Sequence, residues 1–386
     1  MSALTFPTGT YHFNDHPLFD FQLNRVVMWN HGDPAEARGG EITDFPSWER
    51  VLKELSAQAE AREDWAAAAG YLRMAEFFMA PDTPECHAAY DRAREIFYTH
   101  FTYLFAEQGG PIHREEVPYA DGVLPCWRIV PADTSKGAIL FHGGNDSLLE
   151  EFTDALLYLA QGGYTVLAFE GPGQGAALRK SGLTFTPEWE KPVGAVLDHY
   201  GAEDVTIIGV SLGGELCMRA AAMEPRIRRV VSWSVLPSIY GALMADKPAE
   251  IRAKLEHWLD ENNRDAILDL YAGLAEREPL FRWSIQHSNY AYGTSDVYEY
   301  LQKARAFTIE PVAERITQDV LLLSAREDLL VDFALYKQEI DLLKNTRSLE
   351  FAAPGRALNG QAHCNMGNTK YMLDLILNWN DRMLER

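Results

Sequence analysis

A serine near the middle of the chain has the surroundings of an activated nucleophile. Ser211 lies in Gly-Val-Ser-Leu-Gly (209–213), between an apolar run over 205–208 and a helix predicted over 212–223. A G-x-S-x-G sequence in this context is typical of a tight turn that lifts the serine hydroxyl above the edge of a sheet. The free N–H groups at the start of the helix would stabilise an oxyanion nearby. We therefore predict that Ser211 is a nucleophile.

The residues downstream of the serine offer the base and the acid that such a nucleophile needs. A serine hydroxyl is unreactive at neutral pH without a histidine, usually one oriented by a carboxylate. Asp328 follows the apolar run Val320–Leu323, and His363 is the one histidine of eleven that comes after it. The chain order serine, acid, histidine fits this architecture. We predict Asp328 as the orienting acid and His363 as the base, with Glu327 and Asp332 as alternatives for the acid.

A glycine-rich turn supplies candidate donors for an oxyanion. The sequence His-Gly-Gly-Asn-Asp (142–146) directly follows an apolar run. Backbone N–H groups can approach a substrate closely where no Cβ intrudes. We expect the N–H of Gly144 or of Asn145 to act together with that of Leu212. A second glycine-rich segment, 170–175, lacks the pattern of a nucleotide-binding loop, and we interpret it as a structural turn near the mouth of the pocket.

These residues must be positioned by an alternation of strands and helices that follows residue 110. The predicted strands are short, continuous apolar runs, which are typical of strands buried on both faces. Their alternation with helices predicts a mostly parallel, doubly wound α/β sheet. A hairpin over 114–130 precedes it, turning at Asp121-Gly122. The predicted strands are 138–141, 164–169, 205–209, 229–233 and 320–323, and the predicted helices are 148–161, 185–200, 212–223, 332–344 and 367–383.

Two segments fall outside the alternation. Residues 47–108 show three amphipathic helices in succession, which predicts an all-helical N-terminal domain over 1–110 and an α/β domain over 111–386. Residues 236–315 are helical in pattern and rich in large aromatic side chains. Because they lie between two predicted strands, we expect them to form a helical lid over the site.

Four side chains in and before the lid segment are candidates for lining a substrate pocket. They are aromatic or imidazole rings, which suit a substrate with conjugated carbonyl groups. Ordinary core packing is the alternative for each of them. The four are Trp233, Trp283, His287 and Tyr290.

Composition excludes several classes of protein. The 386 residues are 47% hydrophobic, which is ordinary for a globular protein, and the net charge of −21 disfavours binding to nucleic acid. No apolar run approaches the roughly 20 residues of a membrane-spanning helix, so we expect no membrane partner. The four cysteines are far apart and show no metal-ligand spacing, which favours reduced thiols in a cytoplasmic protein without a bound metal.

The motifs together resemble the α/β-hydrolase superfamily over about residues 110–386. The resemblance rests on HGGND at 142–146, EGPGQG at 170–175, GVSLGG at 209–214 and AHCNMGN at 362–368. More narrowly, the chain resembles the group that contains 2,6-dihydroxypseudooxynicotine hydrolase and polyketide chain-shortening hydrolases. The helical N-terminal segment and the aromatic stretch 283–292 agree with that group. One departure is Ala325, where many hydrolases have glycine before the acid.

The resemblance implies an α/β-hydrolase fold and cleavage, without a cofactor, of a carbon–carbon bond next to a ketone in an aromatic or polyketide-like substrate. It places Ser211, Asp328 and His363 as the catalytic triad. Because some members of the group are esterases, an esterase or thioesterase acting on a bulky aromatic or polyketide acyl group is an alternative. Another alternative is a non-catalytic binding protein that uses residues 47–108 as an interaction module. A third is that the helical domain supports the lid and dimerisation, which would make the protein a homodimer.

Overall fold

An eight-stranded, mostly parallel sheet forms the centre of the computed structural model, which describes residue 4 and residues 6–386. Its order is β1-β2-β4-β3-β5-β6-β7-β8; β1 and β2 run antiparallel to their neighbours, and the other strands are parallel. This confirms the predicted sheet. The strands are β1 (Ile112–Tyr119), β2 (Gly122–Ile129), β3 (Ala138–His142), β4 (Thr165–Phe169), β5 (Val205–Val210), β6 (Ile227–Trp233), β7 (Asp319–Leu323) and β8 (Ser348–Ala352).

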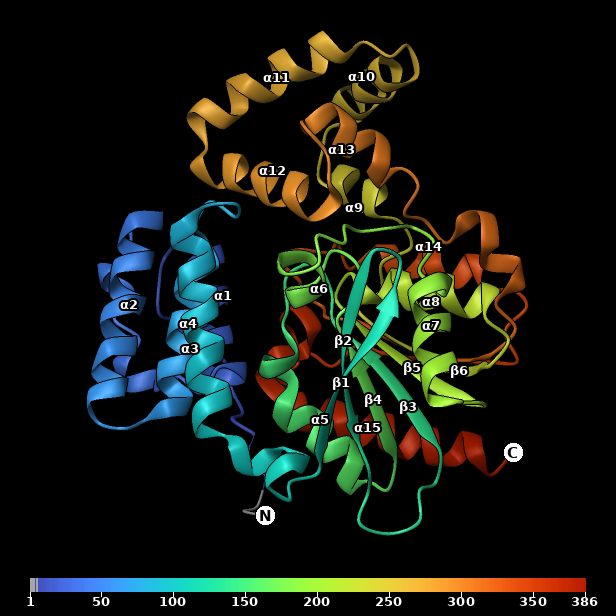
Figure 1. Ribbon diagram of the computed structural model, residues 1–386. Coiled ribbons are helices and arrows are strands. Elements are labelled where there is room, and N and C mark those ends of the chain that lie inside the picture. Colours follow the sequence, from blue (N-terminus) through green and yellow to red (C-terminus); the bar gives the residue numbers. More distant parts are fainter. Residues whose placement is uncertain (1–3, 5) are drawn as a thin grey trace.

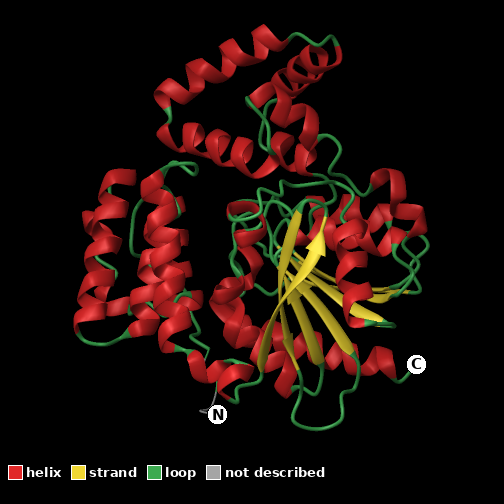
Figure 2. Ribbon diagram, in the orientation of Figure 1, coloured by secondary structure: helices red, strands yellow, loops and turns green. Residues whose placement is uncertain are grey.

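Helices cover both faces of the sheet (Figure 2). Successive side chains of a strand point to opposite faces, so in β3 Leu140 packs into one apolar core while Ile139 and Phe141 pack into the other. Because both faces are covered, the central strands are apolar without interruption, which is why they were predictable. Helices α7 (Glu190–Tyr200) and α8 (Gly213–Met223) contribute to the first core, and α5 (Thr153–Gln161) and α15 (Thr369–Leu384) to the second. The shorter helices are α6 (Gly175–Arg179) and α14 (Leu335–Leu342).

The strand β8 was not predicted from the sequence. It lies at the edge of the sheet, beside β7, and its residues are half-buried or exposed. A strand that is covered so incompletely lacks the continuous apolar run by which the central strands were recognised.

Four helices precede the sheet and pack around an apolar core of their own, beside the sheet (Figure 1). Trp48 and Tyr71 are fully buried in that core. The sequence predicted three of these helices; α1 was missed because its buried residues 22–28 include Gln22, Asn24 and Arg25, so that burial does not follow polarity with a helical period. The four are α1 (Pro17–Trp29), α2 (Phe45–Ala61), α3 (Trp65–Glu76) and α4 (Pro84–His100).

Five α-helices are inserted between β6 and β7. Figure 1 shows them above one end of the strands, with α12 reaching toward the N-terminal helices. Trp283 of α12 bridges the two groups, since its ring centroid lies 5.3 Å from that of Phe77 and 5.0 Å from that of Phe78. The inserted helices are α9 (Ile239–Ala245), α10 (Ala249–Asp260), α11 (Arg264–Arg277), α12 (Pro279–Tyr292) and α13 (Val297–Ala304).

Two further findings bear on the expectations from composition. Across residue 4 and residues 6–386, no helix has the length and apolar character needed to cross a membrane. The four cysteines, all within the described residues, are buried and carry free thiols.

Candidate active site

Ser211 occupies a strained turn between β5 and α8. Its φ of +61° lies in the left-handed region that residues with a side chain rarely adopt. The backbones crowd here: a Cβ at Gly209 would collide with the carbonyl oxygen of Gly213, and one at Gly213 would lie 2.7 Å from the carbonyl oxygen of Gly143. The glycines of the motif are therefore required by packing. The turn holds the serine hydroxyl above the strand end, where a substrate can reach it.

The structure brings Ser211, His363 and Asp328 into one chain of hydrogen bonds. The Nε2 atom of His363 lies 2.8 Å from Ser211 Oγ, and its Nδ1 atom lies 2.7 Å from Asp328 Oδ2. The side chains of His363 and Asp328 are 7% and 4% exposed, so little water competes for these bonds. With Nδ1–H donating to the carboxylate, Nε2 is free to accept the serine proton. The geometry is that of a serine nucleophile with its general base.

The choice among the three candidate acids is decided by their contacts. Asp328 uses Oδ1 to accept hydrogen bonds from the backbone N–H groups of Leu330 and Val331, at 2.8 and 3.0 Å, which leaves Oδ2 for the histidine. Glu327 instead pairs with Arg356 at the surface. Asp332 accepts a hydrogen bond from the backbone of Ala334 and makes no contact with His363. Of the three, Asp328 is thus the carboxylate that orients the imidazole.

The environment of His363 favours the imidazolium. Burial lowers its pKa, but the neighbouring carboxylate of Asp328, together with the side chain of Cys364, raises it, and the pKa of His363 lies well above its ordinary value. A histidine in this setting stabilises the positive charge that it acquires when it takes a proton from the serine.

The glycine-rich turn lies directly beside the serine. A Cβ on Gly144 would lie 2.7 Å from the carbonyl oxygen of Val210 and 2.9 Å from the backbone nitrogen of Leu212, so only glycine fits. The N–H of Gly144 already donates to Ser147 Oγ, at 3.1 Å. Of the two predicted alternatives, Asn145 lines the cavity in front of Ser211 and Gly144 does not, so the N–H of Asn145 remains the candidate donor. The other candidate is the N–H of Leu212, the N-cap residue of α8, which has no intrahelical acceptor.

The segment 170–175, which we interpreted from the sequence as a structural turn, forms hydrogen bonds with the glycine-rich turn. Gln174 donates hydrogen bonds to the carbonyl oxygens of Gly143 and Gly144, at 2.8 and 2.9 Å. His142 supports the same turn: its Nε2 accepts from Trp189, so its Nδ1–H donates to the carbonyl of Gly143. Burial lowers the pKa of His142 to about 4, which keeps the ring neutral.

Trp233 does not line the site, contrary to the prediction. Its indole N–H donates to the carbonyl oxygen of Cys364, at 3.0 Å, and lies 3.3 Å from Asn365 Oδ1. Cys364 and Asn365 both have positive φ angles, and the side chain of Asn365 holds the carbonyls of Ser324 and Gly360. Trp233 therefore fixes the strained loop that carries His363 rather than contacting substrate.

A cavity of about 700 Å³ opens in front of Ser211 and His363. The N-terminal helices, the inserted helices and the α/β part all contribute to its walls. Among the lining residues are Leu18 and Phe77 of the N-terminal region, Trp283 and His287 of α12, and Leu330 of the loop after β7. Its lining is mostly apolar. Such a cavity fits an organic substrate with a large apolar or aromatic body.

Two of the four predicted lining residues face this cavity. Trp283 and His287 line it, one turn apart on α12. Tyr290 lines a smaller neighbouring cavity, of about 30 Å³, together with Cys86 and Arg179. Because Tyr292, farther along α12, does line the main cavity, the position of Tyr290 along the axis does not explain this. Tyr290 lies at the margin of the helix face that carries Ser284, Ser288 and Tyr292.

Comparison with known proteins settles the family. The model of the alpha/beta hydrolase fold matches residues 139–359, more than half of the chain. The chain belongs to the α/β-hydrolase family. The resemblance inferred from the motifs is thereby confirmed.

Fungal hydrolases are among the relatives of this α/β hydrolase. The alpha/beta hydrolase psoB of Aspergillus fumigatus is 29% identical over 344 residues, which cover 76% of this chain and 75% of psoB. The hydrolyase ccsE of Aspergillus clavatus is 28% identical over 380 residues, covering 83% of this chain and 85% of ccsE. Among solved structures, 2,6-dihydroxy-pseudo-oxynicotine hydrolase has the same fold over 92% of this chain and 94% of its own, with a TM-score of 0.66 and 19% identity. At 92% of this chain, the shared fold with 2,6-dihydroxy-pseudo-oxynicotine hydrolase includes most of the helical N-terminal region.

Two buried carboxyl groups lie outside the hydrogen-bonded chain of Ser211, His363 and Asp328. Glu215 on α8 is 1% exposed and Glu339 on α14 is 0% exposed. Burial raises the pKa of each to about 8, and the charge of Glu339 contributes to the shift of Glu215. These two groups therefore hold more protons in the folded protein than in the unfolded chain between pH values of about 4.5 and 8, and their contribution to the free energy of unfolding falls as the pH rises through that window.

Replacing Glu339 by glutamine removes this penalty because an amide does not ionise. We expect the melting temperature of Glu339→Gln to exceed that of the wild type by several degrees at about pH 9, and by much less at about pH 6. Thermal unfolding followed across this range measures the difference. Glu350→Gln, which alters a carboxylate in a surface ion pair with Arg382, is the matched control. A difference between Glu339→Gln and wild type that stays constant with pH would contradict the prediction.

Proposed function

We propose that this α/β hydrolase cleaves a carbon–carbon bond next to a ketone, by a retro-Claisen route, in an aromatic or polyketide-like substrate. The observation that carries the proposal is the hydrogen-bonded chain Ser211–His363–Asp328 at the base of an apolar cavity of about 700 Å³. The chain supplies a nucleophile and a proton carrier, and the cavity accommodates a bulky substrate.

The reaction would begin with attack on the ketone. Ser211 Oγ bonds to the carbonyl carbon while His363 Nε2 takes its proton. The carbonyl oxygen becomes an oxyanion, which accepts hydrogen bonds from the N–H groups of Leu212 and Asn145. Asp328 stabilises the imidazolium that has formed.

The second step separates this reaction from ester hydrolysis. The tetrahedral intermediate collapses, the bond to the α-carbon breaks, and its electron pair leaves as an enolate or an electron-rich ring carbon. The imidazolium of His363 returns the proton to that carbon. Water, deprotonated by His363, then hydrolyses the acyl group on Ser211, so that one ketone and one water give an acid and a shortened product.

The cavity lining suits such a leaving group. A carbanion leaves readily only when a conjugated carbonyl or an aromatic ring delocalises its charge, so the substrate must have an extended planar part. Trp283 and His287, whose rings stack with centroids 5.3 Å apart, offer a planar wall for that part. The structure of 2,6-dihydroxy-pseudo-oxynicotine hydrolase, which shares this fold, supports an aromatic substrate class.

The proposal is tested with two substrates that carry the same acetyl group. Benzoylacetone presents it on carbon, and phenyl acetate presents it on oxygen. We expect purified protein to convert benzoylacetone into acetophenone and acetate, measured by liquid chromatography with mass spectrometry. Rapid turnover of phenyl acetate with none of benzoylacetone would instead assign an esterase, and turnover of neither, with no acetylated Ser211, would favour a binding protein.

A further inference from the structure

We propose that the N-terminal helices position the oxyanion-binding turn, and that Arg25 of α1 does so by holding Asp146. This inference rests on the proposed function, because it takes Asn145 as one of the two oxyanion donors. It assigns the helical region a part in the reaction, beyond covering the cavity. Arg25 is a positioning residue in this proposal, since it acts through Asp146 and not on the substrate.

Arg25 donates hydrogen bonds to two carboxylates of the α/β part, one at the end of the glycine-rich turn 142–146 and one in the segment that follows it. Its Nη1 lies 2.8 Å from Asp146 Oδ1, and its Nη2 lies 2.6 Å from Glu151 Oε2. The side chains of Arg25 and Glu151 are only 5% and 1% exposed. A guanidinium that donates to two carboxylates at once has a fixed orientation, so the position of Asp146 is fixed relative to α1. Asp146 is the next residue after Asn145, so the same contact fixes the direction of the Asn145 N–H.

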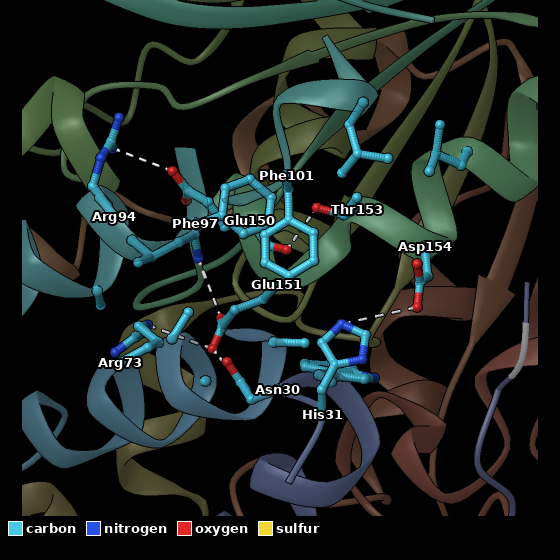
Figure 3. Close-up of a pocket in the computed structure, with 18 of the residues that line it drawn as sticks. Asn30, His31, Arg73, Arg94, Phe97, Phe101, Glu150, Glu151, Thr153 and Asp154 are labelled. Atoms are coloured by element: carbon cyan, nitrogen blue, oxygen red, sulfur yellow. Dashed lines mark hydrogen bonds and ion pairs between the residues drawn. The ribbon is translucent and has the colours of Figure 1, made fainter. Parts of the chain in front are cut away.

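A second arginine of the helical region, Arg73, forms a hydrogen bond with the backbone of Asp146. Arg73 of α3 donates to the carbonyl oxygen of Asp146 through Nη2, and its Nε lies 3.5 Å from Glu151 Oε1. Asn30, just after α1, donates to the same carboxylate oxygen of Glu151, at 3.1 Å. Figure 3 shows Arg73 and Asn30 converging on Glu151 at the boundary between the helices and the α/β part. Side chain and backbone of Asp146 are thus each held from a different N-terminal helix.

The two carboxyl groups that contact Arg25 stay ionised although burial opposes their charge. Burial alone would raise the pKa values of Asp146 and Glu151, but the guanidinium groups beside them lower both. Both carboxylates are therefore ionised at neutral pH, and each has a cationic partner. A buried ion pair is seldom a net source of stability, but its directional bonds fix geometry. That is what an oxyanion site requires, because donors must point at the place where charge develops.

The test uses the rate at which a fluorophosphonate labels the serine, together with steady-state hydrolysis of phenyl acetate. Phosphonylation needs the oxyanion donors and can be followed by intact mass, independently of the natural substrate. We expect Arg25→Met to lower the labelling rate and kcat by at least about 10-fold while KM changes by less than about 3-fold, because donors are misdirected in the transition state. Arg25→Lys, which keeps the charge but cannot bridge both carboxylates, should lie between Arg25→Met and wild type.

Two further variants separate positioning from loss of folding. Asp146→Asn leaves Arg25 paired with Glu151, and we expect it to reproduce the loss in kcat even if Arg25→Met fails to fold. Arg25→Met/Asp146→Asn should be no slower than the slower single variant, because both changes remove one interaction. Arg38→Met is the control: Arg38 also pairs with two carboxylates, Glu41 and Glu54, but away from the turn, so kcat should stay at the wild-type value.

The outcomes distinguish this inference from the proposed function. A folded Arg25→Met or Asp146→Asn variant that labels at the wild-type rate overturns the positioning role, as does a double variant whose loss is the product of the two single losses. If the wild-type protein itself is not labelled at Ser211, the proposed serine chemistry fails, and the positioning role fails with it.

Discussion

Replacing Ser211 by alanine is expected to lower kcat by about 10⁴- to 10⁶-fold. The reason is geometric: Ser211 Oγ lies 2.8 Å from His363 Nε2, at the base of the cavity, so its removal takes away the atom that forms the acyl intermediate. The fold should remain, because alanine retains the Cβ and the left-handed backbone at position 211 is held by the glycines around it. Turnover of benzoylacetone or phenyl acetate measures the loss, and the melting temperature reports on folding.

A second serine of the same cavity is the control for this variant. Ser284 of α12 also lines the cavity, but its hydroxyl donates to the carbonyl of Phe281 within its own helix. We expect Ser284→Ala to retain kcat within about 3-fold, since a hydroxyl that makes no contact with the reacting atoms contributes little to the transition state. Full activity in Ser211→Ala would place the chemistry at another residue.

The central residues of the site could be predicted because their signals are local. The Ser211 turn is recognisable from glycines that crowding makes necessary, and the oxyanion turn from two adjacent glycines after a buried strand. His363 followed from chain order, since one histidine lies after the predicted acid. The choice among Glu327, Asp328 and Asp332 was open in the sequence because it depends on loop geometry, namely which carboxylate turns inward and which meets Arg356 at the surface.

The contributions that the sequence did not indicate come from contacts between distant segments. Arg25 and Asp146 are separated by 121 residues, and nothing in the local pattern around either one indicates the other. Trp233 was misplaced because the residue at the end of a strand can point to either face of the sheet, and the twist and register that decide this are tertiary features. Tyr290 was predicted from its ring type alone, and the sequence does not show which side chains of α12 face the cavity; Tyr290 lines the smaller cavity beside Cys86 and Arg179 instead.

Changing Asp328 to asparagine is expected to lower kcat/KM by about 10⁴-fold and to move the pH profile toward acid. The rate requires neutral His363, so it rises with pH through the pKa of that residue. In the wild type the carboxylate of Asp328 raises that pKa well above its ordinary value, which puts the rising limb above pH values of about 6.5. An amide at position 328 does not favour the imidazolium. The limb of Asp328→Asn should therefore lie at lower pH than that of the wild type, although its plateau is lower.

Measuring kcat/KM for phenyl acetate across about pH 5 to 10 separates this electrostatic effect from a loss of orientation. Glu327→Gln is the matched control. The carboxylate of Glu327, next to Asp328 in the sequence, pairs with Arg356 at the surface, so its replacement should change neither the plateau nor the rising limb. If Asp328 only held the ring in place, the plateau of Asp328→Asn would fall while the limb stayed where it is in the wild type. A shift of the limb toward acid together with the lower plateau is the result that requires the carboxylate to set the charge on His363, as the 2.7 Å contact between Oδ2 and Nδ1 indicates.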